Sequence, residues 1–108
     1  MKRYRVETTL KAETDIVDSF IWGSETWGVE EAIGWANELR TRILKNLSNF
    51  PFKYPVAPER DGSGREYRQM IVGRYRVIFH IEKSVVRVVH VIGSFVDETQ
   101  EEIEDTRE

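Results

Sequence analysis

The strongest pattern along the chain is a run of strand-forming residues between positions 65 and 92. The run is dense in Val, Ile, Tyr and Phe, lacks proline and contains a single glycine, Gly73, which is typical of β-strands. Gly73 and Arg74 have the composition of a two-residue hairpin turn, because glycine readily adopts the positive φ of a type II′ turn. Lys83 and Ser84 form a weaker second turn, since neither residue favours positive φ. We therefore predict three antiparallel strands at 65–72, 75–82 and 85–92.

The two turns also predict which side chains share a face of the sheet, because directly opposed residues of antiparallel strands lie on the same side. One face is apolar and should form the core: it carries Met70, Val72, Tyr75, Val77, Phe79, Ile81, Val86 and Val88. The second face is more polar and carries Tyr67, Gln69, Ile71, Arg76, Ile78, His80, Arg87 and Val89. The same register places His90 on the core face, opposite Val77. Because an antiparallel sheet can bury one face and expose the other, the second face is the candidate interaction surface.

The N-terminal half predicts a strand followed by two helices. Residues 2–8 alternate between apolar and polar, which indicates a first strand whose pairing direction the pattern leaves open. Apolar residues then recur at helical spacing from Leu10, and Gly23 is the expected residue just after the end of this helix. A second helix follows Gly28, with the apolar stripe Ala32, Ala36, Leu39, Ile43 and Leu47. The prediction is a two-layer α+β fold: an N-terminal strand, an antiparallel helix hairpin and a three-stranded antiparallel sheet.

Residues 50–64, with the sequence FPFKYPVAPERDGSG, contain three prolines and two glycines, which predicts an irregular connection. Connections of this length in compact domains are often functional, so a binding role is one interpretation. The alternative is a loop that wraps the end of the second helix, with Phe50, Phe52 and Tyr54 as packing anchors.

Composition limits the class of protein. A chain of 108 residues is the size of one domain, and we assign residues 1–96 to it and residues 97–108 to an acidic tail. The chain has no apolar run of membrane-spanning length and no signal-peptide pattern, so we expect a cytoplasmic protein without a membrane segment. It has no cysteine and two histidines, which excludes disulfides and thiolate ligands and does not favour a zinc site. We expect no metal and no small-molecule cofactor.

The net charge of −3 conceals an uneven distribution. Residues 51–90 carry eight Lys or Arg against four Asp or Glu, whereas residues 91–108 carry one against seven. The predicted sheet is therefore basic and the tail strongly acidic. The tail is either a solvated end or a segment that folds back over the basic sheet.

The order of the predicted elements resembles that of the RelE/ParE toxin superfamily. The resemblance is carried by the segment YRQMIVGRYRVIFHI at 67–81 and the segment VRVVHV at 86–91, together with Ala32, Trp35, the Leu39, Ile43 and Leu47 ladder, and Pro51. It extends to about residue 95 and includes ParE-like plasmid stabilization proteins. It implies a growth-inhibiting toxin of a type II toxin–antitoxin system, silenced by a cognate antitoxin protein.

The superfamily implies two mechanisms, and a ribosome-dependent mRNA endonuclease is the first. In that case His80 could act as acid or base, Arg76 and Arg87 could hold phosphate, and Tyr67 could stack on a base. The nucleases of the family place an arginine just after the last strand and an aromatic hydroxyl near the C-terminus. Residues 92–95 read Ile-Gly-Ser-Phe instead, and the acidic tail is poorly matched to a ribosome. The departures weaken the endonuclease hypothesis.

The second mechanism, which we prefer, is binding of a protein target, and DNA gyrase is the target that the resemblance implies. The target-binding residues would be Tyr67, Arg76, His80 and Arg87. A degenerate module that only binds its antitoxin remains a third alternative. Trp22, Trp27 and Trp35 are expected to pack in the helix hairpin, although an exposed Trp22 or Trp27 would indicate a protein interface. We expect the antitoxin to dock a helix or strand on the helix hairpin and the sheet edge.

Overall fold

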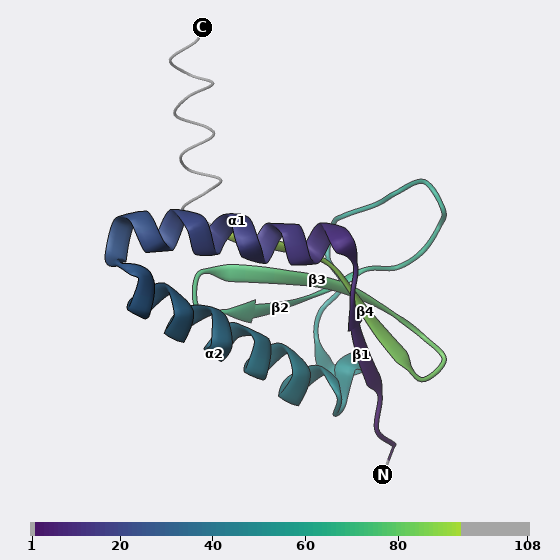
Figure 1. The fold of residues 1–108 in the computed structure, drawn as a ribbon. Coiled ribbons are helices and arrows are strands. Elements are labelled where there is room, and N and C mark those ends of the chain that lie inside the picture. Colours follow the sequence, from purple (N-terminus) through teal and green to yellow (C-terminus); the bar gives the residue numbers. More distant parts are fainter. Residues whose placement is uncertain (1, 94–108) are drawn as a thin grey trace, which may run out of the picture.

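The computed structural model describes residues 2–93, which form two layers, a helix hairpin packed on one face of a four-stranded sheet (Figure 1). In chain order the elements are β1 (Arg5–Thr8), α1 (Leu10–Trp27), α2 (Val29–Leu47), the short 3₁₀ helix η1 (Pro51–Lys53), β2 (Arg68–Val72), β3 (Tyr75–Glu82) and β4 (Val85–Gly93). The predicted α+β class is confirmed. The first strand joins the other three, and the strand order is β1-β4-β3-β2. The predicted acidic tail, residues 97–108, lies outside the described residues.

The register of β2 and β3 is the predicted one. Met70 pairs with Val77 and Val72 with Tyr75, around a turn in which Gly73 has a φ of 59°. At the second turn Lys83 has a φ of 58°, a left-handed conformation that costs a side-chain-bearing residue about 1–2 kcal/mol relative to glycine. The hairpin forms there because the flanking strands pair on both sides of it.

The register of β3 and β4 departs from the prediction at a β-bulge. Phe79 pairs with Val88, whereas Ile78 pairs with His90, so Val89 is an extra residue on β4. The prediction that His90 opposes Val77 was therefore wrong. Val91 takes that place in the core. Beyond Val88 the free edge of β4 is met by α1, where the Asp15 carboxylate accepts the Val91 N–H at 3.0 Å and lies 3.2 Å from His90 Nδ1.

β1 pairs in parallel with β4, the direction that the sequence pattern left open. The chain then passes directly into α1, since the Thr9 N–H donates to Val88 O and the Thr9 hydroxyl accepts the Ala12 N–H at 3.1 Å. This N-cap starts the helix over the sheet.

Gly23 does not end α1, and that prediction was wrong. The helix continues to Trp27, and the change of direction falls at Gly28, whose φ is 103°. A Cβ at position 23 would lie 3.0 Å from the Trp27 ring, so glycine is needed at this position to let the indole pack across the helix. Gly23 therefore resembles a helix terminator in the sequence, but its role is to leave room for the Trp27 ring.

The main core lies between the helices and the sheet. It consists of Ala12, Ile16, Leu39, Ile43 and Leu47 from the helices and Met70, Tyr75, Val77, Phe79, Val86, Val88 and Val91 from the strands. The periodicity of the sequence predicted nearly all of these positions. Burial of this apolar surface is the main stabilising contribution to the fold.

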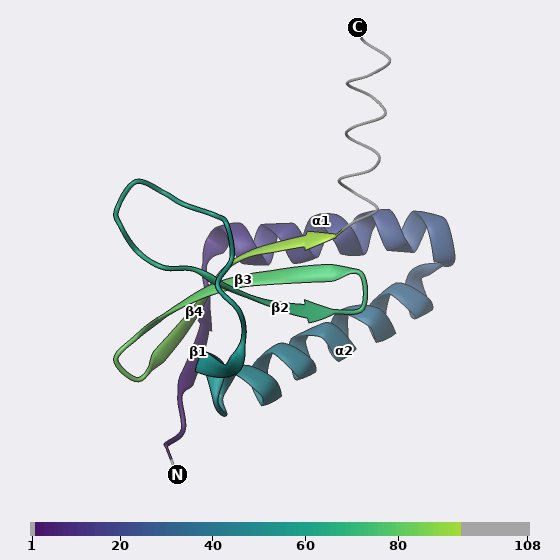
Figure 2. The same ribbon diagram turned by 180° about the vertical axis from the view of Figure 1, so that it is seen from behind.

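The opposite face of the sheet is partly covered by the connection between η1 and β2, which crosses it (Figure 2). Ala57, Tyr67 and Ile78 are buried there as a second small core, with Val89 and Ile92 packed against it. The connection is tied to the edge of β2, because the Ala57 N–H donates to Tyr67 O at 2.8 Å and the Gln69 N–H to Pro55 O at 3.0 Å. The second face is therefore not the open surface that the pattern predicted.

Two isoleucines on this face test the coverage. Ile78 is 0% exposed and Ile71 is 59% exposed, although both were predicted to lie on the solvent side. We expect Ile78→Ala to lower the free energy of unfolding by about 2–5 kcal/mol, because it leaves a cavity under the loop. The matched change Ile71→Ala should cost about 0.5 kcal/mol or less. Urea denaturation measures both, and equal effects would contradict a covered face.

Candidate interaction surfaces

The four residues predicted to bind the target lie on one face of the sheet, the face away from the helices. Arg76 and His80 belong to β3, Arg87 belongs to β4, and Tyr67 immediately precedes β2. His80 and Arg87 are directly paired across the two strands. The structure brings these residues together on one face, but it gives them very different exposures.

Tyr67 and His80 are buried, at 7% and 3% exposed. Their rings meet edge to face with centroids 5.6 Å apart. The Tyr67 hydroxyl donates a hydrogen bond to Asp61 Oδ2 at 2.6 Å, and this bond raises the pKa of the phenol. The pKa of Asp61 is lowered in turn by the Ser63 hydroxyl and by Tyr67. This pair therefore fastens the loop to the sheet.

His80 is held in its neutral form. Burial lowers the pKa of its imidazole, and the nearby charges of Arg65 and Arg87 lower it further. Among the described residues its Nδ1 has no hydrogen-bond partner, although it is shielded from solvent. A buried neutral imidazole next to two guanidinium groups is poorly suited to exchange protons with a ligand that stays in solvent.

Arg76 is bound internally. Gln69 Oε1 accepts hydrogen bonds from Arg76 Nε at 3.0 Å and from Nη2 at 2.7 Å, and Glu59 Oε1 accepts from Nη2 at 2.9 Å. The hydrogen bond from Arg76 holds the pKa of Glu59 below its usual value. Arg76 thus joins the loop to β2 and β3, and its planar guanidinium satisfies both acceptors at once.

Arg87 is the most accessible of the four. Its side chain is 41% exposed, and Arg87 Nη2 lies 2.9 Å from Glu7 Oε1 on the neighbouring strand. Arg5 Nη2 lies 3.0 Å from the other oxygen of Glu7, so the two arginines share a single carboxylate. Because two guanidinium groups share one carboxylate, this part of the surface carries an excess of one positive charge.

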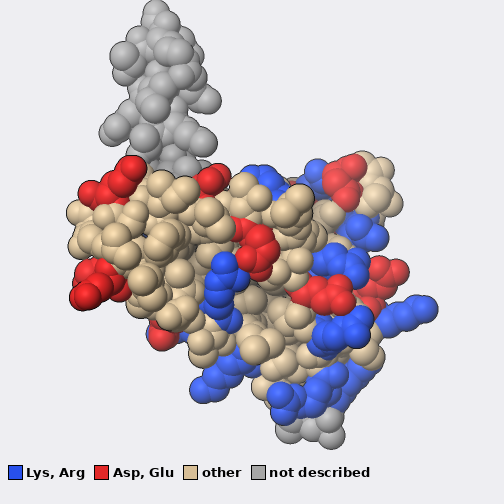
Figure 3. Space-filling model, viewed as in Figure 1, with Lys and Arg blue, Asp and Glu red and all other residues tan. Residues whose placement is uncertain are grey.

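The charges are unevenly distributed over the face seen in Figure 3. Lys and Arg gather around β1 and the β3–β4 turn with several Asp and Glu between them, whereas the closed end of the helix hairpin shows Asp and Glu. Glu30 and Glu31 belong to that acidic end, in the first turn of α2. The closed end of the hairpin is therefore acidic, whereas the opposite end carries most of the Lys and Arg together with some Asp and Glu.

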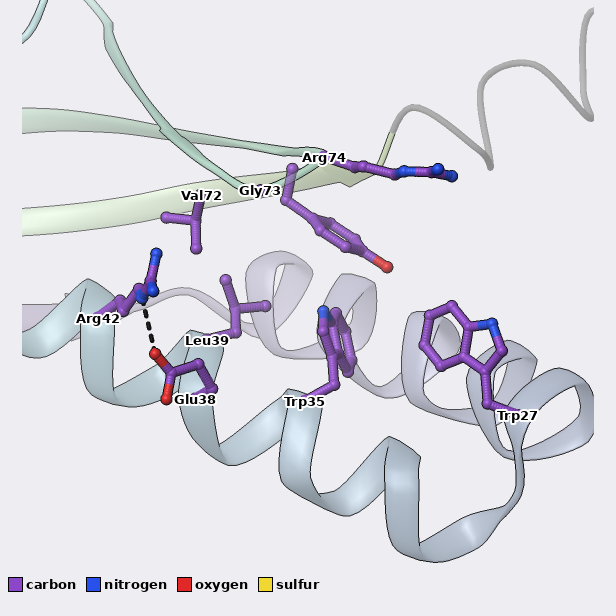
Figure 4. Close-up of a pocket in the computed structure, with 9 residues that line it drawn as sticks. Trp27, Trp35, Glu38, Leu39, Arg42, Val72, Gly73 and Arg74 are labelled. Carbon is purple, nitrogen blue, oxygen red and sulfur yellow. Dashed lines mark hydrogen bonds and ion pairs between the residues drawn. The ribbon is translucent and has the colours of Figure 1, made fainter.

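A groove lies between the helix hairpin and the β2–β3 turn, with a volume of about 450 Å³ (Figure 4). It is lined by Trp27, Trp35, Glu38, Leu39, Arg42, Val72, Gly73, Arg74 and Tyr75. Trp35 and Trp27 project from the helices toward the turn at Gly73 and Arg74.

Aromatic rings make the floor of this groove and ionic groups make its rim. The Trp35 and Tyr75 rings lie 5.0 Å apart, and burial raises the pKa of the Tyr75 phenol to about 12. On the rim Arg42 Nε donates to Glu38 Oε2 at 2.7 Å. Trp27 is 46% exposed, which favours the interface interpretation of this residue over simple packing. An apolar floor with a charged rim is typical of grooves that bind an amphipathic helix.

The sequence did not reveal this groove. Its walls come from α2 and from a β-turn that follows more than 20 residues later, and no local pattern connects Arg42 with Arg74. The one available signal was the excess of tryptophan near the helix junction, and the tryptophans there were expected to be packing residues.

Two kinds of feature are absent from the described residues. Within residues 2–93, no group of three or more His, Cys, Asp or Glu side chains is arranged to hold a metal ion. No helix in the described part of the chain is long and apolar enough to cross a membrane.

Comparisons with known proteins agree with the fold and identify the family. The family model described as the ParE toxin of the type II toxin–antitoxin system parDE matches residues 6–94. None of the curated proteins matches the chain. The match to the family model spans most of the chain, so the chain belongs to the ParE toxin family and is a toxin of the type II class. The predicted resemblance is confirmed.

Two solved structures share the fold. One is described as the chromosomal ParDE toxin–antitoxin system from P. aeruginosa, with a TM-score of 0.70 and 13% identity over 84% of this chain and 96% of that one. Another is the RelBE2 toxin–antitoxin complex from Mycobacterium tuberculosis, with a TM-score of 0.54 and 19% identity over 86% of this chain and 93% of that one.

The burial of His80 predicts a pH dependence of stability. In the unfolded chain its pKa returns to about 6.5, so below this pH the unfolded state binds more protons than the folded state. The contribution of His80 to stability is therefore present above this pH and is lost as pH falls toward the lower folded pKa. Leucine cannot titrate. When the pH is lowered from 7 to below about 6.5, we therefore expect the free energy of unfolding to fall less for His80→Leu than for the parent chain. Denaturation curves across this window measure the difference, and parallel losses would show that His80 is accessible.

Proposed function

We propose that this toxin acts by binding a protein target, and that DNA gyrase is the target, as membership of the ParE family favours. The observation that carries the proposal is the state of His80. Its imidazole is buried and neutral, with the Tyr67 phenol bound to Asp61 and Arg76 bound to Glu59 and Gln69. Two of the groups that an endonuclease would need on this face, Tyr67 and Arg76, are used to hold the loop on the sheet, and the buried His80 is poorly placed to exchange protons with a ligand in solvent.

The mechanism that this geometry supports is steric and electrostatic. A rigid two-layer domain presents a basic end around β1 and the β3–β4 turn and an aromatic groove beside the helix hairpin. Binding at the basic end would hold the target in one conformation without any bond being made or broken. A matching acidic surface on the target would speed association as well as strengthen it.

Parallel assays of one induced culture test the mechanism. We expect expression of the toxin without its antitoxin to arrest growth, to induce the DNA-damage response and to leave translated mRNA uncut in primer extension. Purified toxin should inhibit DNA supercoiling by gyrase. Cuts within translated mRNA, with supercoiling unaffected, would establish the ribosome-dependent endonuclease instead, and unimpaired growth would establish a non-toxic binding module.

We further propose that the cognate antitoxin silences the toxin by laying an amphipathic helix into the aromatic groove between α2 and the β2–β3 turn. The similar solved structures are described as toxin–antitoxin systems, and the groove is lined by the apolar side chains Trp27, Trp35, Leu39, Val72 and Tyr75. Lys or Arg on the polar side of the helix would meet the acidic residues at the closed end of the hairpin, and Asp or Glu would meet Arg42 and Arg74.

Trp27 is the residue on which this docking should depend most. Removing a large half-exposed aromatic side chain from an interface typically costs about 2 kcal/mol or more, so we expect Trp27→Ala to weaken antitoxin binding at least about 30-fold. Phe52→Ala is the control, because Phe52 is a similarly exposed aromatic, at 57%, on η1. Calorimetry with the purified antitoxin measures both. An equal effect of the two changes, or no effect of either, would contradict docking in the groove.

A further inference from the structure

A small hollow lies on the sheet face at the β3–β4 turn, on the far side of the sheet from the helices. Its volume is about 190 Å³, and it is lined by His80, Glu82, Lys83, Val85 and Arg87. It belongs to the basic end of the molecule and is separate from the aromatic groove. Its size suits one small polar group and excludes a folded segment.

We infer that this hollow is a carboxylate-binding pocket, which receives the side chain of an aspartate or glutamate from the toxin's protein target. The inference deepens the proposed function, on which it rests, by naming the chemistry of the contact. Three of the five residues that line the pocket, His80, Lys83 and Arg87, carry side-chain donors.

The state of His80 is the first argument. The ring lines the pocket and is 3% exposed, and its Nδ1 is shielded from solvent with no partner among the described residues. An unbonded buried N–H costs more than an unbonded ring acceptor, so the proton of the neutral imidazole belongs on Nε2. Nε2 is then the N–H donor of the His80 ring, against which the Tyr67 ring packs edge to face.

Lys83 is the second argument. It occupies a left-handed backbone conformation with a φ of 58°, where glycine would form the same turn without strain. Among residues 2–93 its ammonium forms no ion pair, while Arg87 is balanced only by Glu7, a carboxylate that it shares with Arg5. The turn therefore places a lysine in the lining of the pocket, in a conformation that glycine would adopt without strain.

The remaining lining selects a protein carboxylate over a nucleic acid. Glu82 lies at the same pocket and Glu7 lies beside Arg87, so a polyanion would bring further negative charge toward two fixed carboxylates. A single carboxylate satisfies the donors and adds one negative charge only.

A pair of small probes tests the pocket directly. The acetylated, N-methylamidated glutamate carries a carboxylate, and the corresponding glutamine derivative is its neutral equivalent. In NMR titrations of the full chain we expect the glutamate probe alone to shift the His80 ring signals and the backbone signals of Lys83 and Arg87. The chain has two histidines, so His90→Asn identifies the His80 ring. Equal shifts with the glutamine probe, or larger shifts with inorganic phosphate or a short oligouridylate, would overturn the inference.

Lys83→Gly separates binding from folding. The change relieves the left-handed strain, so the unfolding midpoint should stay the same or rise, while the donor is lost. We expect Lys83→Gly and Arg87→Gln each to weaken inhibition of gyrase about 10- to 100-fold, the range for losing a charged hydrogen bond. Lys53→Gln, which removes one positive charge from η1, should leave inhibition unchanged.

The outcomes distinguish this inference from the proposed function. If the parent toxin inhibits gyrase and both pocket variants inhibit it equally well, the pocket inference fails and target binding stands. If the parent toxin does not inhibit gyrase, the choice of target fails, and the paired probes alone decide whether the pocket binds a carboxylate.

Discussion

The structure depends on the burial of β3 on both of its faces. Val77 and Phe79 lie under the helix hairpin, and Ile78 and His80 lie under the loop, so four consecutive residues are almost inaccessible to solvent. Such a strand must be packed on both faces, because an apolar side chain left in solvent does not contribute the free energy of burial. A polar side chain that is buried needs a hydrogen-bond partner. Burial of β3 therefore requires the helix hairpin on one face, the loop on the other and the neighbouring strands at its edges.

Arg76 and Tyr67 show how the second cover is secured. The loop is poor in regular structure, so it cannot be held by strand pairing along its whole length. Hydrogen bonds from Arg76 to Glu59 and from Tyr67 to Asp61 fix it at two points, and the small core around Ala57 fills the space between. Residues whose chemistry would suit catalysis therefore serve to hold the fold together.

The two proposed interaction surfaces differ in chemistry. The aromatic groove beside an acidic helix junction suits an amphipathic partner, while the basic end with its small pocket suits an acidic one. Two chemically distinct surfaces on one domain would let the proposed target and the antitoxin bind at different places.

What the sequence determined by itself is the local structure and the family. Turn chemistry at Gly73 and the apolar alternation on either side of it were sufficient to predict the pairing of Met70 with Val77, because both depend on neighbouring residues. The shared face of Arg76, His80 and Arg87 followed from the same register. The periodicity of the helices likewise predicted their buried stripe, including Leu39 and Ile43.

The tertiary structure decided what depends on contacts between distant segments. The bulge at Val89 moved His90 out of the core, since the end of β4 must meet Asp15 of α1. Gly23 stayed inside its helix because the Trp27 ring packs across it. The loop buried His80, and the groove formed where α2 meets a turn far along the chain. Each of these features depends on packing between segments that are far apart in the sequence. Such contacts cannot be predicted from the pattern of neighbouring residues.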